Sequence, residues 1–299
     1  MAPPPNLHGH PTPGWKEEAV LDTGILLVVL ATALMHASWN AMVRASGDKL
    51  VSLANMTALT ALIGLPLVFF VPWPSREVWA LLALTTLLHT GYKIFLVRAY
   101  AHGGLGHVYP LARGGAPLLV AGAGFVLLGE TLSPASLAGM LLVTLGIISL
   151  AFRKNGGTQD EKRATLYALI TAGFIASYTT VDGIGARFAE TSFAYVAWLF
   201  VLDGAAFTAL ALWRRGPGAA WSPATLLRQG LPGALLQVVA YALVLWAMTK
   251  APLGLVSAVR ETSVVFAALI SSLILKEKLG PMAAIAALAV AAGVILIEG

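Results

Sequence analysis

The sequence lacks cysteine and has few charged residues. Of its 299 residues, 11% are charged and 58% are hydrophobic, and the mean hydropathy is +0.81. The absence of cysteine excludes disulfides, thiolate metal sites and cysteine nucleophiles. Soluble domains carry about a quarter charged residues, so this composition excludes an ordinary soluble domain. We expect an all-α polytopic membrane protein embedded in a lipid bilayer.

Several functional motifs are also missing. The sequence has no His-x-x-x-His, no Gly-Lys-Ser/Thr loop and no paired carboxylates within one expected membrane span, so we expect no catalytic residues, no metal ion and no cofactor. A membrane-embedded enzyme acting on lipid-linked substrates is a remote alternative. The pI of about 9.6 does not indicate nucleic-acid binding, because Lys and Arg lie mostly between apolar runs.

Ten stretches are apolar and long enough to be membrane spans. They are Gly24–Ala45, Val51–Val71, Val78–Tyr100, Leu105–Leu128, Pro134–Phe152, Ala164–Arg187, Phe193–Trp213, Leu226–Met248, Leu253–Leu275 and Pro281–Ile297. Short connections with turn-forming residues separate most of them. Only one connection after the N-terminal tail is long and strongly polar, and it lies at the middle of the chain.

The chain contains an internal repeat. The segment Leu105–Ile148 recurs as Pro252–Ile295 at one constant offset without gaps, so that Arg113 matches Arg260 and Glu130 matches Glu277. The spans Gly24–Ala45 and Ala164–Arg187 match as well. The repeat therefore has five spans, and an odd number inverts the second unit in the membrane, an arrangement found in transporters with the substrate between the units.

The repeat divides the chain into four parts. The expected boundaries are a disordered N-terminal tail at 1–23, a first five-helix unit at 24–153, a polar linker at 154–163 and a second five-helix unit at 164–299. Both units belong to one chain, so a monomer can suffice.

The distribution of basic residues indicates an orientation in the membrane. Basic residues are concentrated at the span ends opposite the termini. The positive-inside rule places those ends in the cytoplasm and the termini outside.

The sequence resembles the drug/metabolite transporter superfamily, specifically its EamA branch. The resemblance rests on the five-plus-five pattern, on Gly-Glu-Thr-Leu-Ser at Gly129–Ser133, on the Glu-x-Leu core that the second unit keeps, and on Ala-Ser-Trp-Asn at Ala37–Asn40. It implies a secondary transporter of the bacterial inner membrane that exports amino acids or related metabolites, without a cofactor. It also implies cytoplasmic termini, against the charge distribution.

Polar side chains inside the spans are the candidate substrate ligands, because ionisable groups at membrane depth are costly. Many share a helical face at a spacing of four. The candidates are His36, Trp39, Asn40, His89, Tyr92, Lys93, Arg113, Tyr178, Asp182, Tyr241, Trp246, Arg260 and Glu261. We expect the stripes to line one cavity, and Tyr109–Pro117 to break its helix.

Each candidate has a competing interpretation. Arg113 and Arg260 can hold a substrate carboxylate, or they can lock the units together through Asp182 or Asp203. Neighbours Arg260 and Glu261 point about 100° apart on a helix, so each needs its own partner. Glu130 lies in a loop, where helix capping is expected. Arg187 is expected to be a boundary residue, and single deep aromatics can be packing residues.

The buried charges favour a small zwitterionic or anionic metabolite, with Lys93 or an Arg as the carboxylate anchor. The alternative is a cation or quaternary-amine transporter that uses the deep aromatics as a cage. Candidate proton carriers are His36, His89, Asp182, Asp203 and Glu261, whereas facilitated diffusion needs none.

Overall fold

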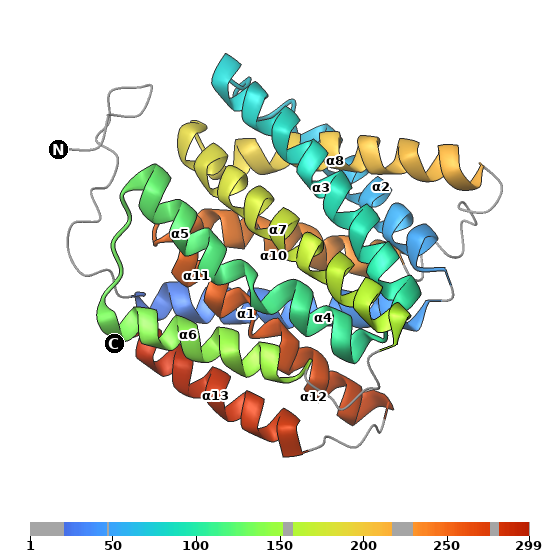
Figure 1. The fold of residues 1–299 in the computed structure, drawn as a ribbon. Coiled ribbons are helices and arrows are strands. Elements are labelled where there is room, and N and C mark those ends of the chain that lie inside the picture. The colour runs from blue at the N-terminus through green and yellow to red at the C-terminus, as the bar shows by residue number, and fades with distance from the viewer. Residues whose placement is uncertain (1–20, 47, 152–157, 217–229, 276–280, 299) are drawn as a thin grey trace.

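The structure, a computed structural model, describes residues 21–46, 48–151, 158–216, 230–275 and 281–298, which fold as a helical bundle (Figure 1). The first half holds α1 (Thr23–Ala45), α2 (Lys49–Leu67), α3 (Arg76–His102), α4 (Leu105–Gly114), α5 (Ala116–Leu128) and α6 (Pro134–Ser149). The second half holds α7 (Gln159–Phe188), α8 (Ser192–Arg215), α10 (Leu231–Met248), α11 (Leu253–Arg260), α12 (Ser263–Leu275) and α13 (Pro281–Glu298).

The helices account for ten spans. Eight helical stretches are long and apolar enough to cross a membrane, and α6 and α13 are shorter apolar helices. The pairs α4/α5 and α11/α12 each form one interrupted span, so eight plus two gives the ten that were predicted. The predicted fold class is confirmed, whereas the exact unit boundaries stay a prediction.

Polar side chains fix where several helices begin. Asp22 accepts hydrogen bonds from the first turn of α1, and Ser75 does the same for α3. A reciprocal capping box between Thr158 and Glu161 starts α7, a common way to satisfy free backbone N–H groups. Helix α7 therefore begins inside the segment 154–163, which was predicted as a linker. Residues 154–157 lie outside the described residues.

Both ends of the described chain lie at the same end of the bundle. The Leu21 backbone N–H donates to the Ile297 carbonyl (3.4 Å), and Thr23 Oγ1 donates to Glu298 Oε1 (2.8 Å). We call this the termini end, and the other the opposite end. Most of the predicted 1–23 tail lies outside the described residues.

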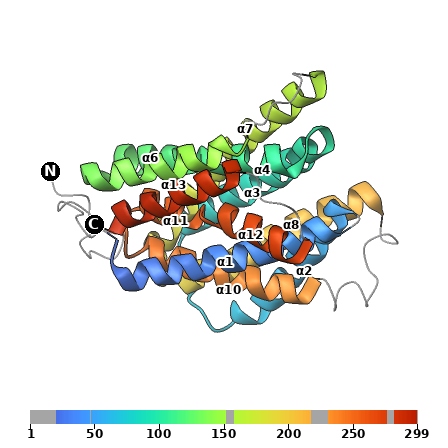
Figure 2. The same ribbon diagram turned by 90° about the horizontal axis from the view of Figure 1, so that it is seen from below.

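The first helix of each half packs against the other half. Helix α1 packs against α10, α11 and α12 of the second half, while α7 packs against α3, α4 and α5 of the first. The equivalent helices α2 and α8 also pack together, as do α6 and α13 (Figures 1 and 2). A two-fold relation between inverted units produces this pattern, and it puts α1 and α7 at the interface between the halves.

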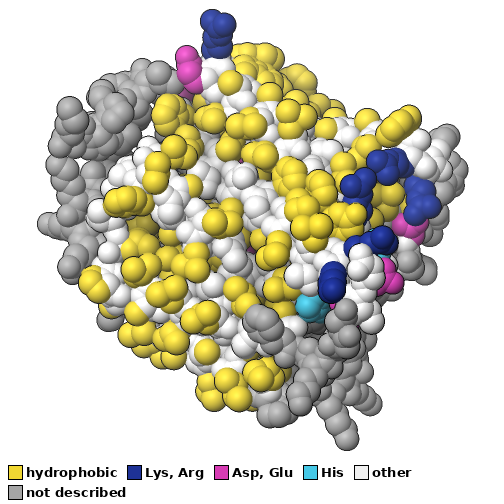
Figure 3. Space-filling view, viewed as in Figure 1, with side chains coloured by type: hydrophobic (Ala, Val, Ile, Leu, Met, Phe, Trp, Pro, Cys, Tyr) yellow, Lys and Arg dark blue, Asp and Glu magenta, His cyan; other side chains and the backbone are white. Residues whose placement is uncertain are grey.

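Many large apolar side chains are exposed on the outer surface. Exposed side chains include Phe70 (85%), Val126 (76%) and Leu288 (71%), as expected for a surface in contact with lipid. Trp73 and Trp213, which lie near the ends of spans, are also exposed. Lys and Arg side chains gather at the opposite end, on the right of Figure 3, which is the charge distribution that the sequence indicated.

Candidate functional site

Two interrupted spans bring charged residues to the centre of the bundle. Helix α4 ends at Gly114 and α5 begins at Ala116, which confirms the predicted break near Arg113. At the equivalent place in the second half, α11 ends at Arg260 and α12 begins at Ser263. Broken spans are tolerated at membrane depth where the irregular backbone is enclosed by protein.

Arg113 is held by a carboxylate from the other half. Its Nε lies 2.7 Å from Glu261 Oε2, and a terminal nitrogen lies 2.7 Å from His36 Nε2. Arg113 and Glu261 are 2% and 0% exposed. The proposed bond from Arg113 to Asp182 or Asp203 is therefore wrong, and this arginine instead joins α4 to the α11–α12 break.

Glu261 also contacts its neighbour Arg260. The Arg260 terminal nitrogen lies 3.4 Å from Glu261 Oε1 and donates to Thr179 Oγ1 at 3.2 Å. Arg113 for Glu261 and Thr179 for Arg260 are separate partners, as expected, and the contact between the two neighbours is additional to them. The helix ends at Arg260, and the following turn brings the carboxylate back beside it.

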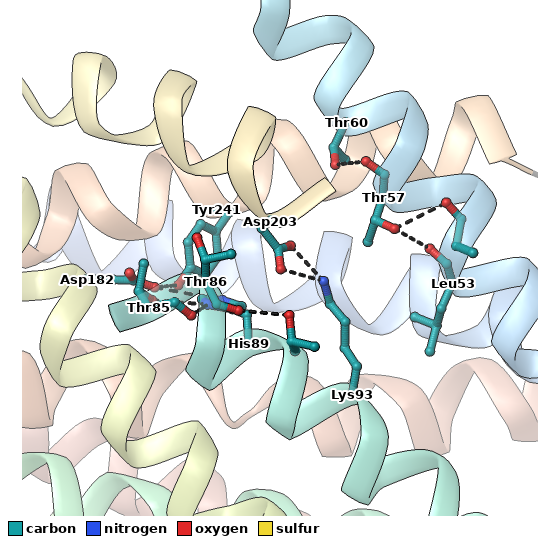
Figure 4. A network of polar contacts seen from close by, with 12 residues as sticks. Leu53, Thr57, Thr60, Thr85, Thr86, His89, Lys93, Asp182, Asp203 and Tyr241 are labelled. Carbon is teal, nitrogen blue, oxygen red and sulfur yellow. Dashed lines mark hydrogen bonds and ion pairs between the residues drawn. The ribbon is translucent and has the colours of Figure 1, made fainter. Parts of the chain in front are cut away.

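Asp182 on α7 is buried and receives hydrogen bonds from two tyrosines. Tyr195 of α8 donates to Oδ1 (3.0 Å) and Tyr241 of α10 donates to Oδ2. His89 Nε2 of α3 lies 3.8 Å from Oδ2, and its Nδ1 contacts Thr85 (Figure 4). The carboxylate is thus held mainly by neutral donors.

Lys93 and Asp203 form a second buried pair. Lys93 Nζ lies 2.7 Å and 2.6 Å from the two carboxylate oxygens (Figure 4), and it lies 4.7 Å from the Phe207 ring centre. This pair joins α3 of the first half to α8 of the second. Its short distances leave Lys93 without a free charge for a substrate carboxylate.

A cavity lies among these groups. Eight of the predicted site residues line it, namely His36, Trp39, His89, Tyr92, Lys93, Tyr178, Tyr241 and Arg260. We call it the central cavity. It is bounded by helices of both halves.

Five predicted site residues do not line the central cavity. Arg113, Asp182 and Glu261 lie behind its wall, where they hold other side chains. Asn40 donates to the His36 carbonyl at 2.7 Å. Trp246 is 38% exposed, so the expectation that it faces the cavity is wrong.

Part of the cavity wall was not predicted from the sequence. The additional lining residues are Thr32, Leu199, Phe200, Asp203, Gln237, Ala240 and Val244. The spacing of four between Gln237 and Tyr241 indicated the glutamine, and Asp203 was considered only as an ion-pair partner or proton carrier. The apolar members had no signal, because a span that is apolar all around does not show which side faces protein.

Aromatic rings cover one side of the central cavity. His89 stacks on Tyr178 with ring centres 4.0 Å apart, and Tyr92 meets Tyr178 at 5.5 Å. Tyr241 meets the edge of His89 at 6.0 Å. Such rings present negative faces that attract organic cations.

A further buried ion-pair cluster joins the two halves at the termini end. Glu130 Oε1 of the α5–α6 loop lies 2.7 Å from Arg187, and Oε2 accepts from the Leu253 N–H at 3.0 Å. Arg187 also donates to the Met248 and Ala251 carbonyls. Glu130 does cap a helix, as expected, but it caps α11 of the other half. Arg187 is not a simple boundary residue, and we call this cluster the latch.

The comparisons with known proteins agree with this architecture. The profile of the EamA-like transporter family matches residues 162–299, which hold the second five-helix unit. No curated protein matches the chain. One solved structure, titled only "Crystal structure of protein", is similar at a TM-score of 0.69 and 20% identity, covering 92% of this chain and 95% of its own, which supports the fold alone. Residues 162–299, somewhat less than half of the chain, thus match the EamA-like transporter family, whose members are membrane transporters of small molecules.

Proposed function

We propose that the protein transports small zwitterionic metabolites, amino acids in particular, across the bacterial inner membrane by alternating access. The observation that supports this is the distribution of buried charge. Lys93, Arg113 and Arg187 each have a carboxylate within 2.7 Å. Among the described residues, neither Arg260 nor Asp182 has an oppositely charged partner within 2.7 Å. One cation and one carboxylate near the cavity are therefore not closely paired.

Arg260 is the proposed anchor for the substrate carboxylate. It lines the central cavity, and its closest carboxylate, at 3.4 Å, is already bound by Arg113 at 2.7 Å. Its Nε is buried without a hydrogen-bond partner in the described residues. A buried guanidinium favours a bidentate carboxylate. This assignment replaces Lys93, which Asp203 neutralises.

The substrate ammonium would lie against the aromatic side of the cavity. Tyr178 and His89 present ring surfaces there, and Asp182 lies behind Tyr241 and His89. The buried carboxylate adds negative potential that water does not screen. A ligand with separated opposite charges therefore fits this cavity better than a simple anion does.

Counterflow in liposomes tests the proposal, with a panel of amino acids and the variants Arg260→Gln and Arg260→Lys. The lost charge-assisted hydrogen bonds correspond to about 1.5–3 kcal/mol, or roughly 10- to 150-fold in apparent affinity. Arg98→Gln is the matched control, since Arg98 is exposed and should change exchange little. If amino acids exchange equally well in Arg260→Gln and wild type, the anchor assignment fails.

A second candidate substrate class is supported by the aromatic surface itself. The stack of His89 on Tyr178 with Tyr92 and Tyr241 nearby is typical of sites for quaternary amines. Choline-like compounds should then compete and exchange while amino acids do not. Arg260→Gln should leave that exchange intact or improve it, because it removes a repelling charge.

A further inference from the structure

Asp182 connects two cavities. Its Oδ2 accepts from Tyr241, which lines the central cavity, and its Oδ1 accepts from Tyr195 at 3.0 Å. Tyr195 lines a different cavity, with about 430 Å³ of unfilled space. The carboxylate itself is 0% exposed. One buried acid therefore has a hydroxyl leading toward each of two cavities.

The second cavity lies at the termini end. It is lined by residues 72–75 of the α2–α3 connection, by residues 188–190 after α7, and by Val78, Ala194 and Tyr195. Glu190, an exposed carboxylate, lies in its wall. We call this space the vestibule. Tyr195 is 0% exposed, so its ring separates the vestibule from Asp182.

Glycine allows the ring to hold this place. At Gly185, an added Cβ would lie against the Tyr195 ring, its hydroxyl oxygen included, which is 2.7 Å from that position. The tyrosine therefore packs directly on the backbone of α7 and points along it to Asp182. A tyrosine hydroxyl both donates and accepts hydrogen bonds, so it can pass a proton between the carboxylate and water.

We propose that Asp182 is an exchangeable proton site, reached from the central cavity through Tyr241 and His89 and from the vestibule through Tyr195. The inference rests on the proposed transport function and adds the coupling ion to it. A proton taken up by the carboxylate from one cavity is released to the other when access alternates. One carboxyl O–H forms and later breaks, and no other reactant is needed.

The surroundings of Asp182 suit this role. The titratable groups that face it are His89 from α3, Tyr195 from α8, Tyr241 from α10 and, on α7 itself, Tyr178. Nearby arginines on α4 and α11 lie beside Glu261 instead, and α5 (Ala116–Leu128) contains no titratable residue. Because no Lys or Arg pairs with Asp182 among the described residues, protonation would not leave an orphaned cation.

The test compares two readings from the same liposomes: uptake driven by an imposed pH gradient, and counterflow at equal pH. Tyr195→Phe removes only the hydroxyl and should lower gradient-driven uptake about tenfold relative to counterflow. Tyr167→Phe, a tyrosine that stacks on His102 far from the vestibule, is the matched control and should leave the ratio unchanged. Asp182→Asn should abolish the gradient response.

A second measurement does not depend on transport. Infrared difference spectra of the protein in lipid should show one carboxyl band that titrates and exchanges in heavy water, and Asp182→Asn should remove it. The proposal is overturned if wild type ignores the gradient while counterflow proceeds, a result that leaves the proposed function intact. It is also overturned if Asp182→Asn leaves every titrating band in place, whatever the transport result.

Discussion

The latch at the termini end predicts how the closed state can be loosened. Glu130 is 3% exposed and is the single carboxylate that both pairs with Arg187 and caps the first N–H of α11. Glu130→Gln keeps the size and an oxygen that can accept from Leu253. It removes the negative charge that joins the α5–α6 loop to the second half.

The free-energy cost of Glu130→Gln depends on the hydrogen bonds that Arg187 keeps. Removing one partner of a buried ion pair costs about 3–5 kcal/mol. The Arg187 side chain is 16% exposed, however, and it keeps the Met248 carbonyl at 2.8 Å and the Ala251 carbonyl at 3.0 Å. We therefore expect about 2 kcal/mol, which shifts the equilibrium between closed and open termini end roughly 30-fold toward open.

A single cysteine can report this shift, because the chain has none of its own. Ser257 on α11 is 0% exposed, so Ser257→Cys should react with a polar thiol reagent only when the termini end opens. Glu130→Gln should raise the reaction rate roughly 30-fold. Asp160→Asn, which breaks the exposed pair with His102, is the control and should change the rate less than about fivefold.

The effects of changing Glu130 and Arg187 should also be coupled. Arg187→Gln combined with Glu130→Gln should open the termini end little more than either change alone, since both remove the same pair. An unchanged cysteine reaction rate in Glu130→Gln would refute the latch. Fully additive effects of the two changes would refute the pairing as its cause.

Three further predictions concern the rest of the bundle. Lys93→Met should lower the free energy of unfolding by about 3–5 kcal/mol, because it leaves the buried Asp203 charge without its partner. Adding Asp203→Leu should restore part of this loss, and additive losses in thermal melts would contradict the prediction. Gly139→Ala should loosen the α6–α13 contact by about 1–3 kcal/mol, since the new methyl would collide with the backbone carbonyl oxygen of Gly293 and would also meet the Ile297 and Leu296 side chains at 3.0 Å. Gly122→Ala has open space and should be neutral or stabilising in the same melts. A cysteine at Ser75 should be labelled from outside the cell if the basic opposite end is cytoplasmic, and labelling only after permeabilisation would reverse that orientation.

The fold followed from the sequence because its signals are local and repeated. Apolar length fixed the spans, and the repeat fixed their number and the equivalence of Arg113 and Arg260. The helix break at Arg113 was signalled by Pro110 and Gly114–Gly115. The matching break after Arg260 has no proline or glycine, so only the repeat itself could have indicated it.

The partners of the charges could not be read in the same way. Lys93 and Asp203 are 110 residues apart, and nothing in either span shows which buried charge faces which. Trp246 is a different case, since it follows Tyr241 by five residues and so lies about 140° around the helix. Spacing alone could have placed it away from the cavity.

The most direct test of the central claim compares one amino acid with its decarboxylated amine and its deaminated acid, by equilibrium binding to wild type and Arg260→Gln. If Arg260 binds the carboxylate of a zwitterion and the aromatic side of the central cavity binds its ammonium, wild type should bind the amino acid tightest. Arg260→Gln should then bind the amino acid and the amine alike. Equal binding of amino acid and amine by wild type would contradict the account.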